Sequence, residues 1–76
     1  MSFLIPEAVA DALDAGVPAF KAFRIFADRS IPELADAAHM EPRRLADIEA
    51  GCHPRPDEVT ALGRALRVPT RLLTRR

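Results

Sequence analysis

The chain has 76 residues, which suits one small domain and leaves too little material for both a hydrophobic core and a deep catalytic cleft. Its 11 basic and 11 acidic residues balance, whereas nucleic-acid binders usually carry a positive excess. Residues 1–20 hold three acidic residues and no Lys or Arg, but residues 51–76 hold six arginines against two acidic residues. We therefore expect no enzyme, and a basic face is possible only on the C-terminal half.

The cysteine content and the length of the apolar runs indicate the cellular compartment. Cys52 is the single cysteine, so no disulfide can form within the chain, which fits a reducing environment. The start of the chain lacks the basic region of a signal peptide, and no apolar run reaches membrane-spanning length. No second Cys or His pair accompanies Cys52 and His53 to bind a metal. We expect a cytoplasmic single domain over residues 1–76, without membrane contact, metal or other cofactor.

The first expected helix covers about residues 6–15. Pro6 suits the first helical position, and Gly16 can end the helix. Val9 and Leu13 are four residues apart and therefore share one face.

A second helix is expected to begin near Pro18. Phe20, Phe23 and Ala27 form an apolar stripe with the spacing of one helix face, which predicts core positions. Ile25 falls off this stripe. Together with the apolar residues at 3–5, it either forms an exposed patch for a partner or folds onto the core.

The third helix has a clear start signal in Ser30, followed three residues later by Glu33. This spacing predicts a capping box, in which each residue satisfies a backbone N–H of the other. His39 stands where the helix should end, at a position that often requires a left-handed backbone. The inward positions are predicted to be Leu34, Ala37 and Ala38.

The fourth helix is expected to begin at Pro42 and to stop at Gly51, with Leu45 and Ile48 on its inward face. A fifth helix follows over residues 57–68. Its inward residues are predicted to be Val59, Leu62 and Leu66.

The C-terminal segment after the fifth helix begins with Pro69, which starts a last short turn. That turn places Leu72 and Leu73 for packing. Because the chain is small, this leucine pair also suggests a homodimer.

These elements predict an all-α fold, a small five-helix bundle. Two of its helices, Ser30–Ala38 and Pro42–Ala50, are separated by only three residues. A connection this short favours a helix-turn-helix, in which the first helix braces the second against DNA.

The stretch "SIPELADAAHMEPRRLADIEAG" resembles the Cro and phage-repressor type of helix-turn-helix, the XRE family. Leu34-Ala35 and the sequence from Ile48 to Gly51 carry the match, and the resemblance covers residues 18–73. Residues 5–24 also resemble small members encoded as antitoxins beside toxin genes. The resemblance implies a homodimeric regulator that binds double-stranded DNA in the major groove, with a toxin or other protein as an additional partner.

Within this resemblance, the DNA-contacting candidates are Arg43, Arg44, Asp47, His53 and Arg55. Arg43 is expected either to pair with a guanine edge or to form a solvated pair with Asp47. Arg44 is expected either to contact a base or a phosphate, or to be a solvated surface charge. Asp47 can accept from cytosine but repels phosphate, so a surface ion pair is its alternative role.

The loop candidates are His53 and Arg55, which can approach the DNA backbone, although His53 equally suits a plain loop residue. The resemblance also implies a structural role for Glu49, with Arg24 as its partner.

Several positions depart from the family pattern and support a different function. Ile31 and Cys52 stand where relatives often place phosphate-contacting residues, and Pro42 cannot donate a hydrogen bond. The alternative is therefore a protein-interaction module that keeps the same fold with eroded DNA reading.

Overall fold

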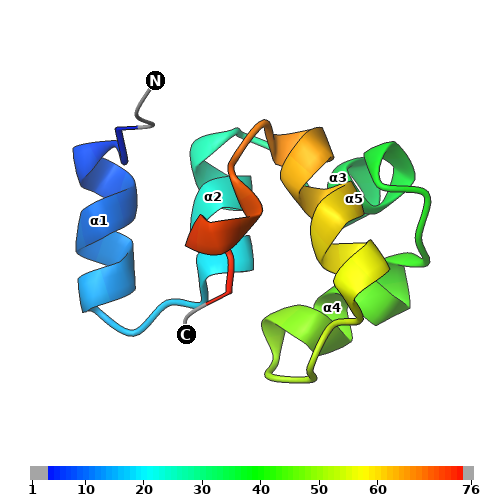
Figure 1. Cartoon of the computed structure of the whole chain (residues 1–76). Coiled ribbons are helices and arrows are strands. Elements are labelled where there is room, and N and C mark those ends of the chain that lie inside the picture. The colour runs from blue at the N-terminus through cyan, green and yellow to red at the C-terminus, as the bar shows by residue number, and fades with distance from the viewer. Residues whose placement is uncertain (1–3, 75–76) are drawn as a thin grey trace.

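A computed structural model describes residues 4–74 as five α-helices and one short 3₁₀ helix, with no strand in that range (Figure 1). The elements are α1 (Glu7–Asp14), α2 (Ala19–Phe26), α3 (Ile31–Ala37), α4 (Pro42–Glu49), α5 (Pro56–Leu66) and η1 (Thr70–Leu72). Helix α2 lies between α1 on one side and the group of α3, α4 and α5 on the other. The predicted all-α fold with five helices is confirmed.

The start of α3 has the predicted capping box. The Glu33 backbone N–H donates to the Ser30 hydroxyl at 3.2 Å, and the Ser30 backbone N–H donates to Glu33 Oε1 at 2.8 Å. The Ser30 backbone N–H, followed by its hydroxyl, lowers the pKa of Glu33. Two N–H groups left free by helix geometry are thus satisfied by local side chains.

Left-handed residues separate consecutive helices. Gly16 and Gly51 follow α1 and α4 with φ of 94° and 121°, as expected for residues that lack a Cβ. His39 has φ 57°, so the predicted left-handed turn after α3 is present without glycine. Asp28 and Arg67 take similar values after α2 and α5. The chain therefore turns sharply after each of the five α-helices.

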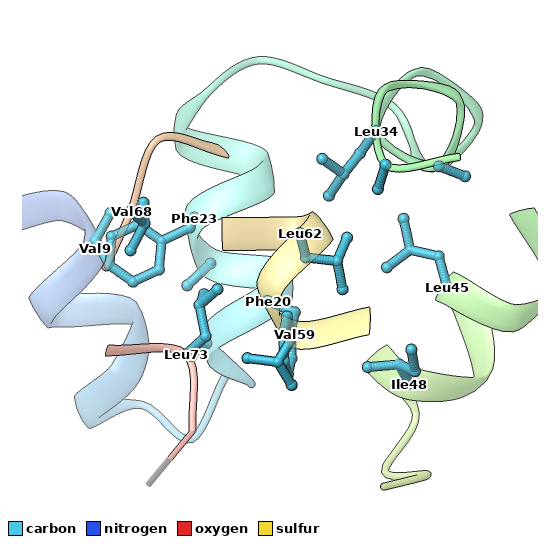
Figure 2. Close-up of a cluster of buried hydrophobic side chains, with 14 residues drawn as sticks. Val9, Phe20, Phe23, Leu34, Leu45, Ile48, Val59, Leu62, Val68 and Leu73 are labelled. Atoms are coloured by element: carbon cyan, nitrogen blue, oxygen red, sulfur yellow. The ribbon is translucent and has the colours of Figure 1, made fainter. Parts of the chain in front are cut away.

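The hydrophobic core draws side chains from every α-helix and from the C-terminal segment (Figure 2). Leu34, Leu45 and Leu62 are 0% exposed and join α3, α4 and α5. On the other side of α2, Val9 from α1 packs near Phe23 and Val68. These two groups fix the α3–α4 pair and α1 to the same central helix.

Two alanines predicted to face inward do not. Helix α2 ends at Phe26, so Ala27 lies beyond the helical stripe and is exposed. Ala37 is also exposed, because the buried face of α3 consists of Leu34, Ala35 and Ala38. The Ala27 prediction was wrong because it extended the helical spacing past the end of α2, whereas Ala37 lies within α3 but on its exposed side.

The C-terminal leucines mainly complete the core. Leu73 is only 3% exposed, and Leu72 is half-buried against the same cluster. A leucine pair used in this way offers little surface for a second chain. Phe3 of the predicted apolar patch, and Arg75 and Arg76 of the predicted basic segment, lie outside the described residues.

No helix within residues 4–74 combines the length and apolar character that a membrane span requires. The longest, α5, has 11 residues, whereas a span needs about 20.

Candidate nucleic-acid interface

The α3–α4 unit has the compact turn that a helix-turn-helix requires. The His39 N–H donates to the Asp36 carbonyl at 3.1 Å, and the Met40 N–H donates to the Ala35 carbonyl at 2.9 Å. With His39 in the left-handed region, these bonds end α3 and direct the chain into α4 within four residues. The turn therefore sets the angle between the two helices.

An ion pair joins the start of α4 to the start of α5. Arg44 Nε donates to Glu58 Oε2 at 2.8 Å, and Arg44 Nη2 donates to Glu58 Oε1 at 2.8 Å. Arg44 Nη2 also donates to the His53 carbonyl at 3.1 Å. Arg44 thus holds both α5 and the loop that leads to it, and its guanidinium is engaged within the domain.

The carboxylate of Glu58 is buried, with only 5% of the residue exposed. It accepts from Arg44 and from the Arg55 backbone N–H, the latter at 2.8 Å. Hydrogen bonding to Arg44, then to the Arg55 N–H, lowers the pKa of Glu58 to about 2, although burial acts in the opposite direction. The charged form is therefore the one that the fold stabilises.

A second ion pair joins the end of α4 to α2. Arg24 Nε donates to Glu49 Oε2 at 2.7 Å, and Arg24 Nη2 donates to Glu49 Oε1 at 3.1 Å. Arg24 Nη1 also donates to the Arg29 carbonyl at 2.8 Å. The predicted pairing of Glu49 with Arg24 is confirmed, and α4 is tied to the domain near both of its ends.

The outward face of α4 consists of small side chains and two opposite charges. Arg43 and Asp47 are exposed, and no hydrogen bond or ion pair engages either side chain within residues 4–74. The predicted alternative of an Arg43–Asp47 pair is thus absent from this structure. Ala46 and Ala50 share the face, so a surface can approach the helix closely between the two charges.

The loop candidates after α4 are exposed. The His53 side chain reaches solvent, while its carbonyl holds Arg44. The Arg55 side chain is 69% exposed and contacts Asp57 Oδ1 at 3.3 Å and Glu58 Oε2 at 3.5 Å. The Arg55–Asp57 pair is exposed on both sides and contributes little, about 0–1 kcal/mol, so Arg55 can exchange it for a phosphate.

The electrostatic surroundings of α4 are not strongly positive. Residues 41–58 hold three arginines against five acidic residues, a net charge of −2. A shallow groove beside the turn is bordered by Asp36, Glu41 and Asp57. The described residues therefore provide Arg43 and Arg55 as separate positive points instead of a continuous positive face.

The three departures from the family pattern occupy defined places. Ile31 is half-buried and packs against the core, which explains an apolar residue at the start of α3. Pro42 is exposed at the first position of α4, and Cys52 is exposed just after Gly51. None of them supplies a hydrogen-bond donor comparable to the residues that the pattern predicts.

Sequence reasoning missed the role of Glu58, which was not among the predicted site residues. A local signal existed, because Glu58 stands three residues after Arg55 at the helix start, the spacing of a carboxylate that accepts from the N-cap N–H. The partner Arg44 lies 14 residues away and is brought near only by the angle between α4 and α5.

No group of three or more His, Cys, Asp or Glu side chains suited to a metal ion occurs within residues 4–74. Comparison with protein-family models, curated proteins and solved structures gives no match for this chain.

Proposed function

We propose that the protein is a small cytoplasmic helix-turn-helix regulator that inserts α4 into the major groove of DNA. The observation that carries this proposal is the contrast between Arg43 and its neighbours. Arg44 and Glu49 are tied into the domain, whereas Arg43 projects from the first turn of α4 and has no partner among residues 4–74. A rigid helix that presents one unpaired arginine suits base recognition.

The outward face of α4 assigns distinct roles to its side chains. Arg43 pairs with the O6 and N7 atoms of guanine, and Asp47 accepts from the amino group of cytosine. Ala46 and Ala50 leave room for the helix to approach the bases. Arg44 acts as a positioning residue for α4, since its Nε and Nη2 atoms already donate to Glu58 and to the His53 carbonyl.

The loop after α4 supports orientation on the duplex. Arg55 contacts a phosphate without reading sequence, and His53 lies beside it on the same exposed loop. A homodimer would place two α4 helices at half-sites about one helical turn apart. The resemblance of residues 5–24 to antitoxins supports a further role, in which the protein neutralises a toxin and represses its own operon.

A protein-interaction module is the second candidate function. The net charge of −2 over residues 41–58 favours it, because phosphate repels this surface apart from Arg43 and Arg55. In that case the α3–α4 unit serves as a rigid platform for another protein.

The experiment selects a binding site from random duplexes with the wild-type protein. Arg43→Ala and Arg55→Ala are then titrated against the selected duplex and a scrambled one at several salt concentrations. Arg43→Ala should reduce the discrimination between the two duplexes by about 1–3 kcal/mol. Arg55→Ala should weaken binding to both duplexes alike and lower the slope of log affinity against log salt concentration by about one unit.

The control is Arg71→Ala, which removes the same charge from the exposed surface beside α1. This variant should leave the discrimination unchanged. If the wild type enriches no sequence, the DNA proposal is wrong and the protein-interaction candidate is favoured.

A further inference from the structure

Helices α1 and α2 form an apolar groove that the helix-turn-helix does not use. The short connection between them makes the two helices antiparallel neighbours, with α1 on the side of α2 away from α3, α4 and α5 (Figure 1). Ile25 and Phe26 are 54% and 55% exposed, which is unusual for large apolar residues in a chain with so few of them. The groove is lined by Ala8, Ala12, Val17, Lys21, Ala22, Ile25 and Phe26.

The two helices contribute different side chains to this groove. Helix α1 offers the small residues Ala8 and Ala12, four positions apart. Asp11 does not line the groove, but it is exposed and, three positions after Ala8, it neighbours this pair on the helix surface. Helix α2 offers the bulky Ile25 and the basic Lys21, again four positions apart. One wall is thus small and has an acidic neighbour, whereas the other is bulky and basic.

We propose that this groove is the homodimer interface and that its occupant is the same groove of a second copy. A two-fold axis parallel to the helices lays α1 of one copy over α2 of the other. Ile25 then meets Ala8 of the second copy, and Lys21 faces Asp11 of the second copy. Size and charge are complementary at the same time, and each contact occurs twice.

Two further observations favour a second copy over other occupants. The groove encloses about 170 Å³, which is below the roughly 300–1,000 Å³ of small-molecule sites and suits a protein side chain. Leu73 is buried in the core and Leu72 is half-buried, so the C-terminal leucines do not provide the dimer surface. This inference rests on the proposed dimeric regulator and names the surface through which it assembles.

Sedimentation analysis at micromolar concentrations tests the interface. The wild type should be a dimer, and Ile25→Glu should be a monomer at the same concentrations. Ala8→Glu should also give a monomer, whereas the matched control Ala37→Glu, at an exposed alanine of α3 outside the groove, should remain dimeric. Circular dichroism verifies that each variant is folded.

A charge exchange tests the pairing between copies. Lys21→Asp and Asp11→Lys should each raise the dimer dissociation constant by about tenfold, or about 1.4 kcal/mol, because each creates two like-charge contacts between the copies. The double variant should regain most of the wild-type affinity. A monomeric wild type, a dimeric Ile25→Glu, or a double variant no better than the singles would overturn the proposal.

Binding to a single half-site separates this inference from the DNA proposal. Ile25→Glu should retain wild-type affinity for an isolated half-site and lose the additional affinity for a palindrome. If the wild type dimerises through the groove but enriches no DNA sequence, the interface stands and the DNA proposal fails. If Ile25→Glu binds the palindrome as tightly as the wild type, the interface proposal fails while DNA binding stands.

Discussion

At the scale of single residues, Glu58 has the greatest influence on the candidate interface. Its carboxylate is buried and satisfies both the Arg44 guanidinium and the Arg55 backbone N–H. An unpaired carboxylate at this depth would be costly, so Arg44 and Glu58 depend on each other. The consequence is that two adjacent arginines differ: Arg44 is paired within the domain, whereas Arg43 is exposed.

The lowered pKa of Glu58 predicts acid sensitivity. The folded-state pKa of about 2 is below the ordinary value of 4.5, so ionised Glu58 stabilises the fold fully above about pH 4.5. This contribution is lost progressively as the pH falls toward 2. Urea unfolding of the wild type and Glu58→Gln should therefore show a difference in unfolding free energy that is constant from pH 5 to 7 and shrinks between pH 4.5 and 2. A difference that does not vary with pH would contradict the assignment.

At the scale of elements, α4 is the helix with an ion pair near each end. The pair to α5 involves its third residue, and the pair to α2 involves its last residue, Glu49. The intervening outward face is consequently held at a fixed angle to the rest of the domain. Without the ion pairs, the α3–α4 turn would fix the start of α4, and the position of its C-terminal end would depend on the packing of Ile48.

Removing one partner of the Arg24–Glu49 pair should be destabilising. The two side chains are only 12% and 6% exposed, so Glu49→Met should lower the unfolding free energy by about 3 kcal/mol because it leaves Arg24 without its carboxylate. The double variant Arg24→Met, Glu49→Met should recover much of that loss. Denaturant titration of both single variants and the double variant measures this coupling. Additive losses would show that the two residues are energetically independent.

The end of α5 provides a test of backbone strain. Arg67 has φ 59°, where a side chain costs about 1–2 kcal/mol relative to glycine. Arg67→Gly should therefore raise the unfolding free energy, by up to about 1 kcal/mol after the greater freedom of glycine in the unfolded chain is considered. The matched control Arg64→Gly, inside α5, should lower it by about 1 kcal/mol. Thermal unfolding measures both variants. If the two substitutions change the unfolding free energy in the same direction, the explanation by backbone strain is wrong.

Local signals predicted most of these elements. The Ser30–Glu33 box, the proline at position 42 and the glycine at position 51 all marked helix boundaries that the structure confirms. Errors arose where a helix ended earlier than its apolar spacing suggested, as at Ala27. The candidate site was harder to predict than the fold.

The candidate site was harder to predict because the pairing of side chains from different helices depends on the angles between those helices. The Arg24–Glu49 pair was foreseen only through a family resemblance, and the Arg44–Glu58 pair was not foreseen. The exposure of Phe26, which follows the Phe20–Phe23 stripe, was not predicted either. Sequence periodicity identifies which face of a helix is apolar but not which neighbour covers it.

At the scale of the whole molecule, the core is one cluster whose side chains lie on both sides of α2 (Figure 2). Helices α3, α4 and α5 each contribute a fully buried leucine to the core. Helix α1 contributes a single buried residue, Val9. The helix-turn-helix part is therefore expected to be more stable than the attachment of α1.

Two substitutions should separate these parts. Ile48→Ala should lower the global unfolding free energy by about 2–5 kcal/mol, because it leaves a cavity in the α4 packing. Val9→Ala should instead increase amide exchange mainly in α1, with slower exchange retained in α3, α4 and α5. Hydrogen-exchange mass spectrometry of both variants makes the comparison. Uniform acceleration of exchange by Val9→Ala would indicate a single cooperative core.

Proline at the helix starts also affects the chain when it is unfolded. Six of the seven prolines stand at the N-cap or in the first two positions of an element, where no backbone N–H is required: Pro6, Pro18, Pro32, Pro42, Pro56 and Pro69. Each ring restricts the denatured ensemble and so disfavours it, typically by about 0.4–1 kcal/mol where the folded backbone accommodates proline. A chain with one cysteine and a modest core thereby gains stability from the conformations that its unfolded state cannot sample.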